Sequence, residues 1–100
     1  MKSRFASRKD KNQPAIEQAL TAAGYRWWST HRCGYGYPDL HVLSKTDVPV
    51  LMECKMPGEG LTELEQDFHD AYDGPLEIVH SGEEALTEMA WWDEYVIEAR

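Results

Sequence analysis

Three charged residues, Asp39, Glu53 and Lys55, stand at the ends of two neighbouring apolar segments. Carboxylates are the usual protein ligands of a hard cation such as Mg²⁺. A cation held in this way polarises a scissile phosphate and lowers the pKa of a bound water. A lysine beside it stabilises the negative charge that develops on the phosphate. The pattern predicts a metal-dependent phosphodiesterase site, with a salt-bridged cluster on a solvated strand face as the alternative.

The two apolar segments are predicted to be strands, at residues 40–44 and 50–55, joined by a loop at residues 45–49. Side chains alternate between the two faces of a strand. Leu51, Glu53 and Lys55 therefore share one face of the second segment, opposite the face of its other apolar side chains.

We expect these strands to form an antiparallel hairpin in which Leu43 lies opposite Leu51. This register would place Asp39 opposite Lys55. It would also make Asp39 and Glu53 diagonal neighbours, roughly 7–8 Å apart. The expectation depends on register, because a slip of one residue would turn every side chain to the other face.

Further elements are predicted on both sides of the hairpin. Pro14 and Gly24 suit the start and end of a first helix, and Thr62 with Glu65 forms a capping box before a second. The expected elements are a helix at 13–23, a strand at 25–30, a helix at 63–72, a strand at 76–80 and a helix from 81 to about 89. This order predicts an α/β domain with a mixed central sheet flanked by helices.

One hundred residues make one domain. We expect residues 1–11 to form a flexible basic arm and residues 12–100 to form the domain. No apolar run is long enough to span a bilayer and the N-terminus has no secretory apolar region, so the prediction is a cytoplasmic protein that does not enter a membrane. Cys33 and Cys54 lack neighbours at zinc-ligand spacing and are interpreted as reduced thiols.

Charge is distributed unevenly along the chain. The net charge is −8, yet residues 1–32 carry seven Lys or Arg against two acids, a balance of +5. Residues 33–100 carry three Lys or Arg against sixteen acids, a balance of −13. The basic part could contact phosphates, or it could be a frayed terminus on an ordinary solvated surface.

The order of several short motifs resembles that of the small stand-alone VRR-NUC proteins of phages and bacteria, within the PD-(D/E)XK nuclease superfamily. The resemblance covers about residues 12–86. The motifs that carry it are Gly36-Tyr37-Pro38-Asp39-Leu40, Glu53-x-Lys55, Leu61-Thr62-x-x-x-Gln66 and Val79-His80-Ser81-x-Glu83-Glu84-Ala85.

The resemblance implies a restriction-endonuclease-like αβββαβ core and a Mg²⁺- or Mn²⁺-dependent DNA endonuclease. Stand-alone members are similar to Holliday junction resolvases, which implies branched DNA as a substrate and a homodimer. By position, Asp39 and Glu53 would be metal ligands and Lys55 the catalytic lysine. Gln66 matches a helix glutamine near the active site of family members.

Other residues have two interpretations each. Several relatives carry a helix-1 glutamate at the position of Ala15, whereas here the helix-1 acid is Glu17, either a third metal ligand or a boundary residue. His41 could ligate metal or contact DNA, or it could be packed or solvent-facing. Arg26, His31 and Arg32 are candidate DNA-binding residues, with ordinary loop roles as the alternative. The pairs Trp27-Trp28 and Trp91-Trp92 could stack on bases, or pack in the core or a dimer interface.

A reading from a different class needs no catalytic site. An acidic chain of this size could mimic DNA and inhibit a nucleic-acid enzyme, using the −13 segment. A nuclease fold that binds DNA without cutting it is a third possibility.

Overall fold

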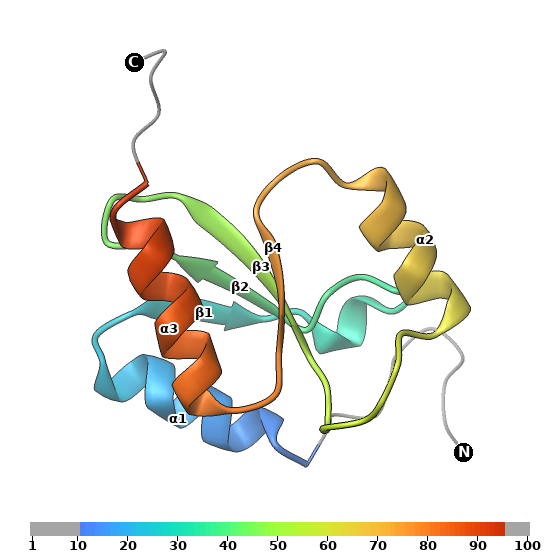
Figure 1. The fold of residues 1–100 in the computed structure, drawn as a ribbon, viewed down its shortest axis with the longest axis horizontal. Coiled ribbons are helices and arrows are strands. Elements are labelled where there is room, and N and C mark those ends of the chain that lie inside the picture. Colours follow the sequence, from blue (N-terminus) through green and yellow to red (C-terminus); the bar gives the residue numbers. More distant parts are fainter. Residues whose placement is uncertain (1–10, 96–100) are drawn as a thin grey trace.

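A computed structural model describes residues 11–95 of the protein (Figure 1). The elements follow the predicted order of helix, three strands, helix, strand and helix. They are α1 (Gln13–Ala22), β1 (Arg26–Ser29), β2 (Leu40–Leu43), β3 (Pro49–Cys54), α2 (Glu63–Ala71), β4 (Leu76–Val79) and α3 (Gly82–Asp93), with a 3₁₀ turn η1 (His31–Cys33) after β1. The expected basic arm at residues 1–11 lies almost entirely outside the described residues.

The four strands form one mixed sheet in the order β1-β2-β3-β4. β1 pairs with β2 and β2 with β3 in antiparallel fashion, whereas β3 and β4 are parallel. The parallel pair requires a crossover, which α2 and its two connecting loops provide. The predicted α/β architecture with a mixed sheet is thereby confirmed.

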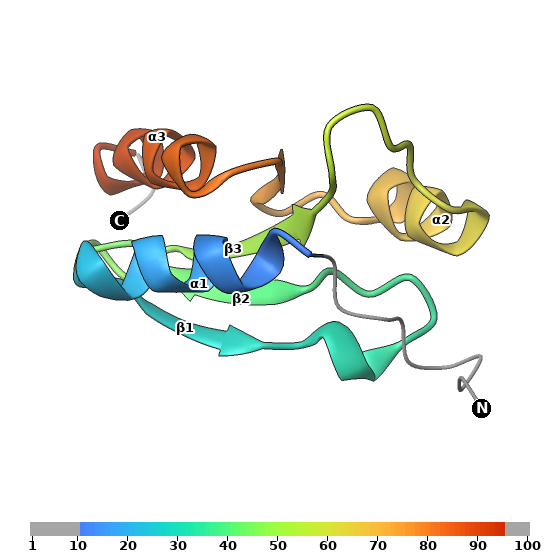
Figure 2. The same cartoon turned by 90° about the horizontal axis from the view of Figure 1, so that it is seen from below.

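The hydrophobic core lies between one face of the sheet and the helices α1 and α3, which lie side by side in both views (Figures 1 and 2). Ile16 and Leu20 of α1 recur at helical spacing, so both point into this core. The fully buried members are Ile16, Leu20, Leu40, Val42, Val50, Met52, Cys54, Val79, Ala85 and Met89.

α2 stands apart from the other two helices in both views (Figures 1 and 2). Its first turn carries the predicted capping box, in which the Thr62 hydroxyl accepts from the Glu65 N–H and the Glu65 carboxylate accepts from the Thr62 N–H. Strand alternation puts Glu53 and Lys55 on the face opposite the core, and α2 covers that face because Glu65 contacts Lys55.

Leu64, Phe68 and Ala71 recur at helical spacing, but the buried apolar stripe that they predict for α2 was wrong. Leu64 is 48% exposed and Ala71 is also exposed, whereas Glu65 is buried and Phe68 and His69 are half-buried. The helix is rotated relative to the expectation because the ion pair between Glu65 and Lys55 gives a buried partner to a carboxylate. Hydrophobic pattern alone does not anticipate that contact.

The predicted hairpin register was also wrong, by two residues. Leu43 lies opposite Pro49 instead of Leu51. The cause is a short turn in which the Ser44 hydroxyl accepts from the Val48 N–H and Asp47 adopts a positive φ of 65°. A shift of two residues keeps every side chain on its expected face, so the faces were predicted correctly and only the pairing changed.

Two smaller differences concern α3. The helix extends to Asp93, beyond the expected end near Met89, and so includes both tryptophans of the C-terminal pair. The spacing of Ser81 and Glu84 also predicts a capping box at the start of this helix. The Ser81 hydroxyl does accept from the Glu84 N–H, but the Glu84 carboxylate contacts His80 instead of completing the box.

Candidate functional site

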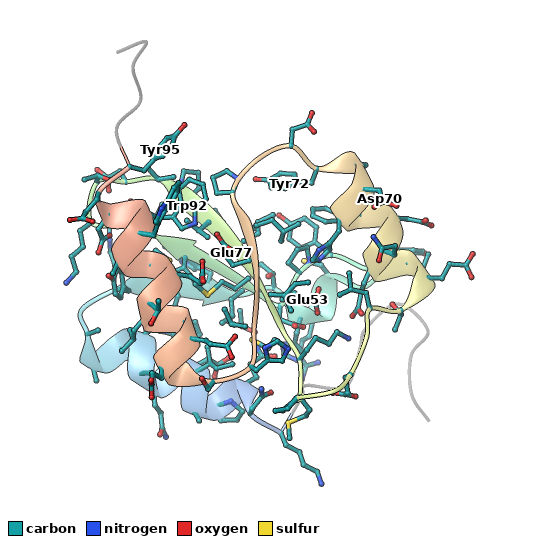
Figure 3. All side chains as sticks on the ribbon, viewed as in Figure 1. Glu53, Asp70, Tyr72, Glu77, Trp92 and Tyr95 are labelled. Atoms are coloured by element: carbon teal, nitrogen blue, oxygen red, sulfur yellow. The ribbon has the colours of Figure 1, made fainter. Side chains whose placement is uncertain are left out.

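Asp39 and Glu53 lie side by side at one end of the sheet. Leu40 and Met52 are directly paired on antiparallel strands, and Asp39 comes just before Leu40 while Glu53 comes just after Met52. Their carboxyl groups share a hydrogen bond, and both side chains are buried, with residue exposures of 8% and 1%. Glu53 lies near the middle of the molecule, between α3 and α2 in the view of Figure 3.

The backbone around Asp39 explains its position. Pro38 has no N–H, and its carbonyl accepts from the Thr30 hydroxyl instead of continuing the ladder with β3. The Asp39 Oδ2 atom then accepts from the N–H of Cys54 at 2.8 Å. The carboxylate therefore takes the place of a backbone acceptor at the end of β3, which fixes it next to Glu53.

Proximity and burial shift the ionisation of Glu53. Burial, the hydrogen bond with Asp39 and the charge of Asp39 together raise the pKa of Glu53 to about 10, although the positive charge of Lys55 acts in the opposite direction. Glu53 therefore keeps its proton at neutral pH. A divalent cation could replace that proton, since it too would neutralise two adjacent carboxylates.

Lys55 belongs to the same face and forms a buried ion pair with Glu65 of α2, with 2.7 Å between Nζ and Oε1. Burial raises the pKa of Glu65, but hydrogen bonds from Lys55 and Thr62 outweigh it and the pKa is lowered overall. The predicted alternative of a salt-bridged cluster on a solvated face is wrong, because all four of these charged side chains are buried: Asp39, Glu53, Lys55 and Glu65.

His69, one turn after Glu65, completes the inner face of α2. Its Nε2 atom lies 3.8 Å from Oε1 of Glu53, too far for a direct hydrogen bond. Burial and the charge of Lys55 lower the pKa of His69, and they outweigh the acidic neighbours Glu65 and Asp70. The imidazole is therefore neutral at pH 7.

Sequence reasoning missed Glu65 and His69 as members of this group. Glu65 was assigned to helix capping, and it does cap, but the same carboxylate also reaches Lys55. The available signal was the spacing of Glu65, Phe68 and His69, which places all three on one helical face.

Two further predicted site residues, Gln66 and Glu17, have hydrogen-bond partners within their own helices. Gln66 is exposed and donates a hydrogen bond to Asp70, which lies on α2 (Figure 3). Glu17 accepts a hydrogen bond from Gln13 and lines a groove with Trp27 at the outer side of α1.

The N-terminus of α1 is nevertheless fastened close to the site. The Asn12 side chain donates to the carbonyls of Lys55 and His80. Gln13 follows it and is fully buried, and its Oε1 atom has no hydrogen-bond partner among residues 11–95. This glutamine was not singled out from the sequence.

The candidate DNA-binding residues separate into two locations. Arg26 is exposed, pairs with Asp47 and lies opposite Leu43, at the far end of β1 from the carboxylates. His31 and Arg32 belong to η1, at the same end of the sheet as Asp39, whose carbonyl accepts from the Thr30 N–H. Only the second location is next to the site.

The structure shows what His41 and the two tryptophan pairs contact. His41 lies opposite Leu51, not Glu53, and its ring contacts Trp28 edge-on at 5.6 Å between centroids. Trp27 packs against the core, whereas Trp28 and Trp91 are 50% and 57% exposed. Trp92 donates to Glu77 of β4 (Figure 3).

Within residues 11–95, no group of three or more His, Cys, Asp or Glu side chains is arranged to hold a metal ion. The two adjacent carboxylates remain, and Mg²⁺ is commonly bound by one or two carboxylates with water in the other positions. No helix in the described part of the chain is long and apolar enough to cross a membrane.

Comparisons with known proteins gave no match: no family model matches the chain, and the searches of curated proteins and of solved structures found no match. Membership of the VRR-NUC family therefore stays a prediction from the motifs.

Proposed function

We propose that the protein is a metal-dependent endonuclease that hydrolyses phosphodiester bonds in DNA, on a PD-(D/E)XK-like core. The observation that carries the proposal is the buried pair of Asp39 and Glu53, hydrogen-bonded to each other with Lys55 on the same face. Burying two acids side by side is costly in a small domain, and buried acids with a strongly shifted pKa cluster at functional sites.

Asp39 and Glu53 would hold the cation, which supplies a Lewis acid for the phosphate and an activated water. Lys55 would offer its positive charge to the phosphate. Glu65 is a positioning residue, since its ion pair holds the Lys55 ammonium in one orientation. Asp39 is itself oriented by the Cys54 N–H, so both acids are fixed before any substrate arrives.

DNA would approach from the end of the sheet that carries η1, where Arg32 and His31 offer contacts to phosphates. The chain as a whole is acidic, so these few groups, the basic residues 1–11 and the cation would supply the attraction. A homodimer would present two such sites to two strands of a branched substrate. Trp91 and Tyr95, both exposed, are candidate interface residues.

Cleavage of labelled four-way junction, flap, duplex and single-stranded DNA tests the proposal, each with Mg²⁺, Mn²⁺ or EDTA. The chain would be compared with Glu53→Ala and Lys55→Gln, and with Glu63→Gln as a control in the exposed first turn of α2. We expect metal-dependent cutting that both site variants lose and the control keeps. If no substrate is cut with either metal, a DNA-binding or inhibitory protein becomes the better account.

A further inference from the structure

Two buried polar atoms face each other without partners at the centre of the site. Glu53 Oε1 and His69 Nε2 form no hydrogen bond with any group in residues 11–95. They lie 3.8 Å apart, and the two side chains are only 2% and 11% exposed. An unsatisfied buried polar atom costs about 1–3 kcal/mol, so two of them at this distance indicate that a third species belongs between them.

The surrounding charges favour a cation as that species. The other oxygen of Glu53 is directed to Asp39, and Oδ2 of Asp39 is occupied by the Cys54 N–H. On the α2 side, Glu65 neutralises the nearby Lys55 through their ion pair. A net negative charge therefore remains on the two strand carboxylates, next to a nitrogen lone pair.

The distance is compatible with one ion that contacts both atoms. Bonds of about 2.0–2.1 Å to nitrogen and to oxygen span at most roughly 4.2 Å, which exceeds the observed 3.8 Å. The donor types carry further information, because imidazole nitrogen suits first-row transition ions, whereas Mg²⁺ prefers oxygen ligands.

We propose that His69 is a metal ligand and that, with Glu53, it makes the site selective for a divalent transition-metal ion such as Mn²⁺ over Mg²⁺. The inference rests on the proposed function, because it assigns the cofactor class of the same site. The protein supplies His69 and Glu53, and water or phosphate oxygens complete the coordination shell. His69 lies on α2, so the bound ion would also tie this helix to the sheet.

Metal binding can be measured without DNA. Calorimetric titration of the full chain with Mn²⁺ and with Mg²⁺ would compare wild type and His69→Gln. We expect Mn²⁺ to bind at least about tenfold more tightly than Mg²⁺, and His69→Gln to lose at least about tenfold in Mn²⁺ affinity with little change for Mg²⁺. His80→Gln is the matched control, since the His80 side chain pairs with Glu84 and not with Glu53.

A second measurement needs no variant at the site. In nuclear magnetic resonance spectra, substoichiometric Mn²⁺ should broaden the ring signals of His69 before those of His41 and His80. Equal Mn²⁺ affinity in wild type and His69→Gln, or selective broadening of His41 instead, would overturn the inference. The absence of Mn²⁺ binding would overturn the inference, and the absence of both Mn²⁺ and Mg²⁺ binding would overturn the proposed function as well.

The two proposals can fail separately. If Mn²⁺ binds through His69 but no DNA is cut, the ligand assignment stands and the nuclease proposal fails. If DNA is cut and His69→Gln keeps full Mn²⁺ affinity, the nuclease proposal stands and His69 is not a ligand.

Discussion

Replacing Glu53 with glutamine should stabilise the metal-free protein. The folded chain keeps Glu53 protonated, because burial and Asp39 raise its pKa to about 10 from the usual 4.5 of a glutamate. Between these values the folded state binds one proton more than the unfolded state. The free energy of unfolding therefore falls by about 1.4 kcal/mol for each pH unit. At pH 7, about 3 kcal/mol has been lost relative to pH 4.5.

Glutamine resembles the protonated form of Glu53, since its amide can donate to Asp39 as the carboxylic acid does. Glutamine does not ionise in the unfolded chain, so the free energy of unfolding no longer falls as the pH rises. We expect Glu53→Gln to raise the free energy of unfolding by about 3 kcal/mol at pH 7, by more at pH 9 and by little near pH 4.5.

Urea denaturation followed by tryptophan fluorescence at pH 5, 7 and 9, with EDTA present, measures this difference. Glu63→Gln removes an exposed carboxylate of the same type and should leave the pH profile almost unchanged. Parallel profiles for wild type and Glu53→Gln would refute the reasoning, because they would show that Glu53 is ionised in the folded protein.

Three further predictions concern the supports of the site and one remote tyrosine. Gly36→Ala should cost about 1–3 kcal/mol more in urea denaturation than Gly58→Ala, because both positions have positive φ but only the Cβ at Gly36 would meet α2 backbone, at 2.2 Å. Lys55→Met and Glu65→Leu each leave one charge of the buried ion pair without its partner, so each should lower the free energy of unfolding by about 3–5 kcal/mol. The double variant should regain most of that stability, and additive losses in the double variant would contradict the pairing. Tyr25, whose pKa burial and Asp93 raise to about 12, should be the last tyrosine to ionise in an ultraviolet titration, and Tyr25→Phe should remove that late phase; an unchanged late phase would assign it elsewhere.

The fold was largely predictable because its signals are local. Pro14 and Gly24 delimit α1, the Thr62 and Glu65 capping box begins α2, and the order of elements follows from these points. The faces of β2 and β3 were also correct, since side-chain alternation does not depend on register when the shift is two residues.

The pairing within the site was less accessible from the sequence. Register depended on the turn after β2, where the Ser44 side chain and the left-handed Asp47 shorten the connection. The change brought Asp39 beside Glu53 instead of diagonal to it. The roles of Glu65 and His69 depended on how α2 packs on the sheet, and a buried ion pair, not an apolar stripe, sets that orientation.

The central claim is that Asp39, Glu53 and a divalent ion cleave DNA together. The most direct measurement is the single-turnover rate on the best substrate of the DNA panel at saturating Mn²⁺, for wild type and Asp39→Asn. Asparagine can still accept from the Cys54 N–H, so the fold should be kept. We predict a rate at least about a hundredfold lower for Asp39→Asn, and no cutting by wild type in EDTA. A wild-type rate in folded Asp39→Asn, or cutting that persists in EDTA, would contradict the account.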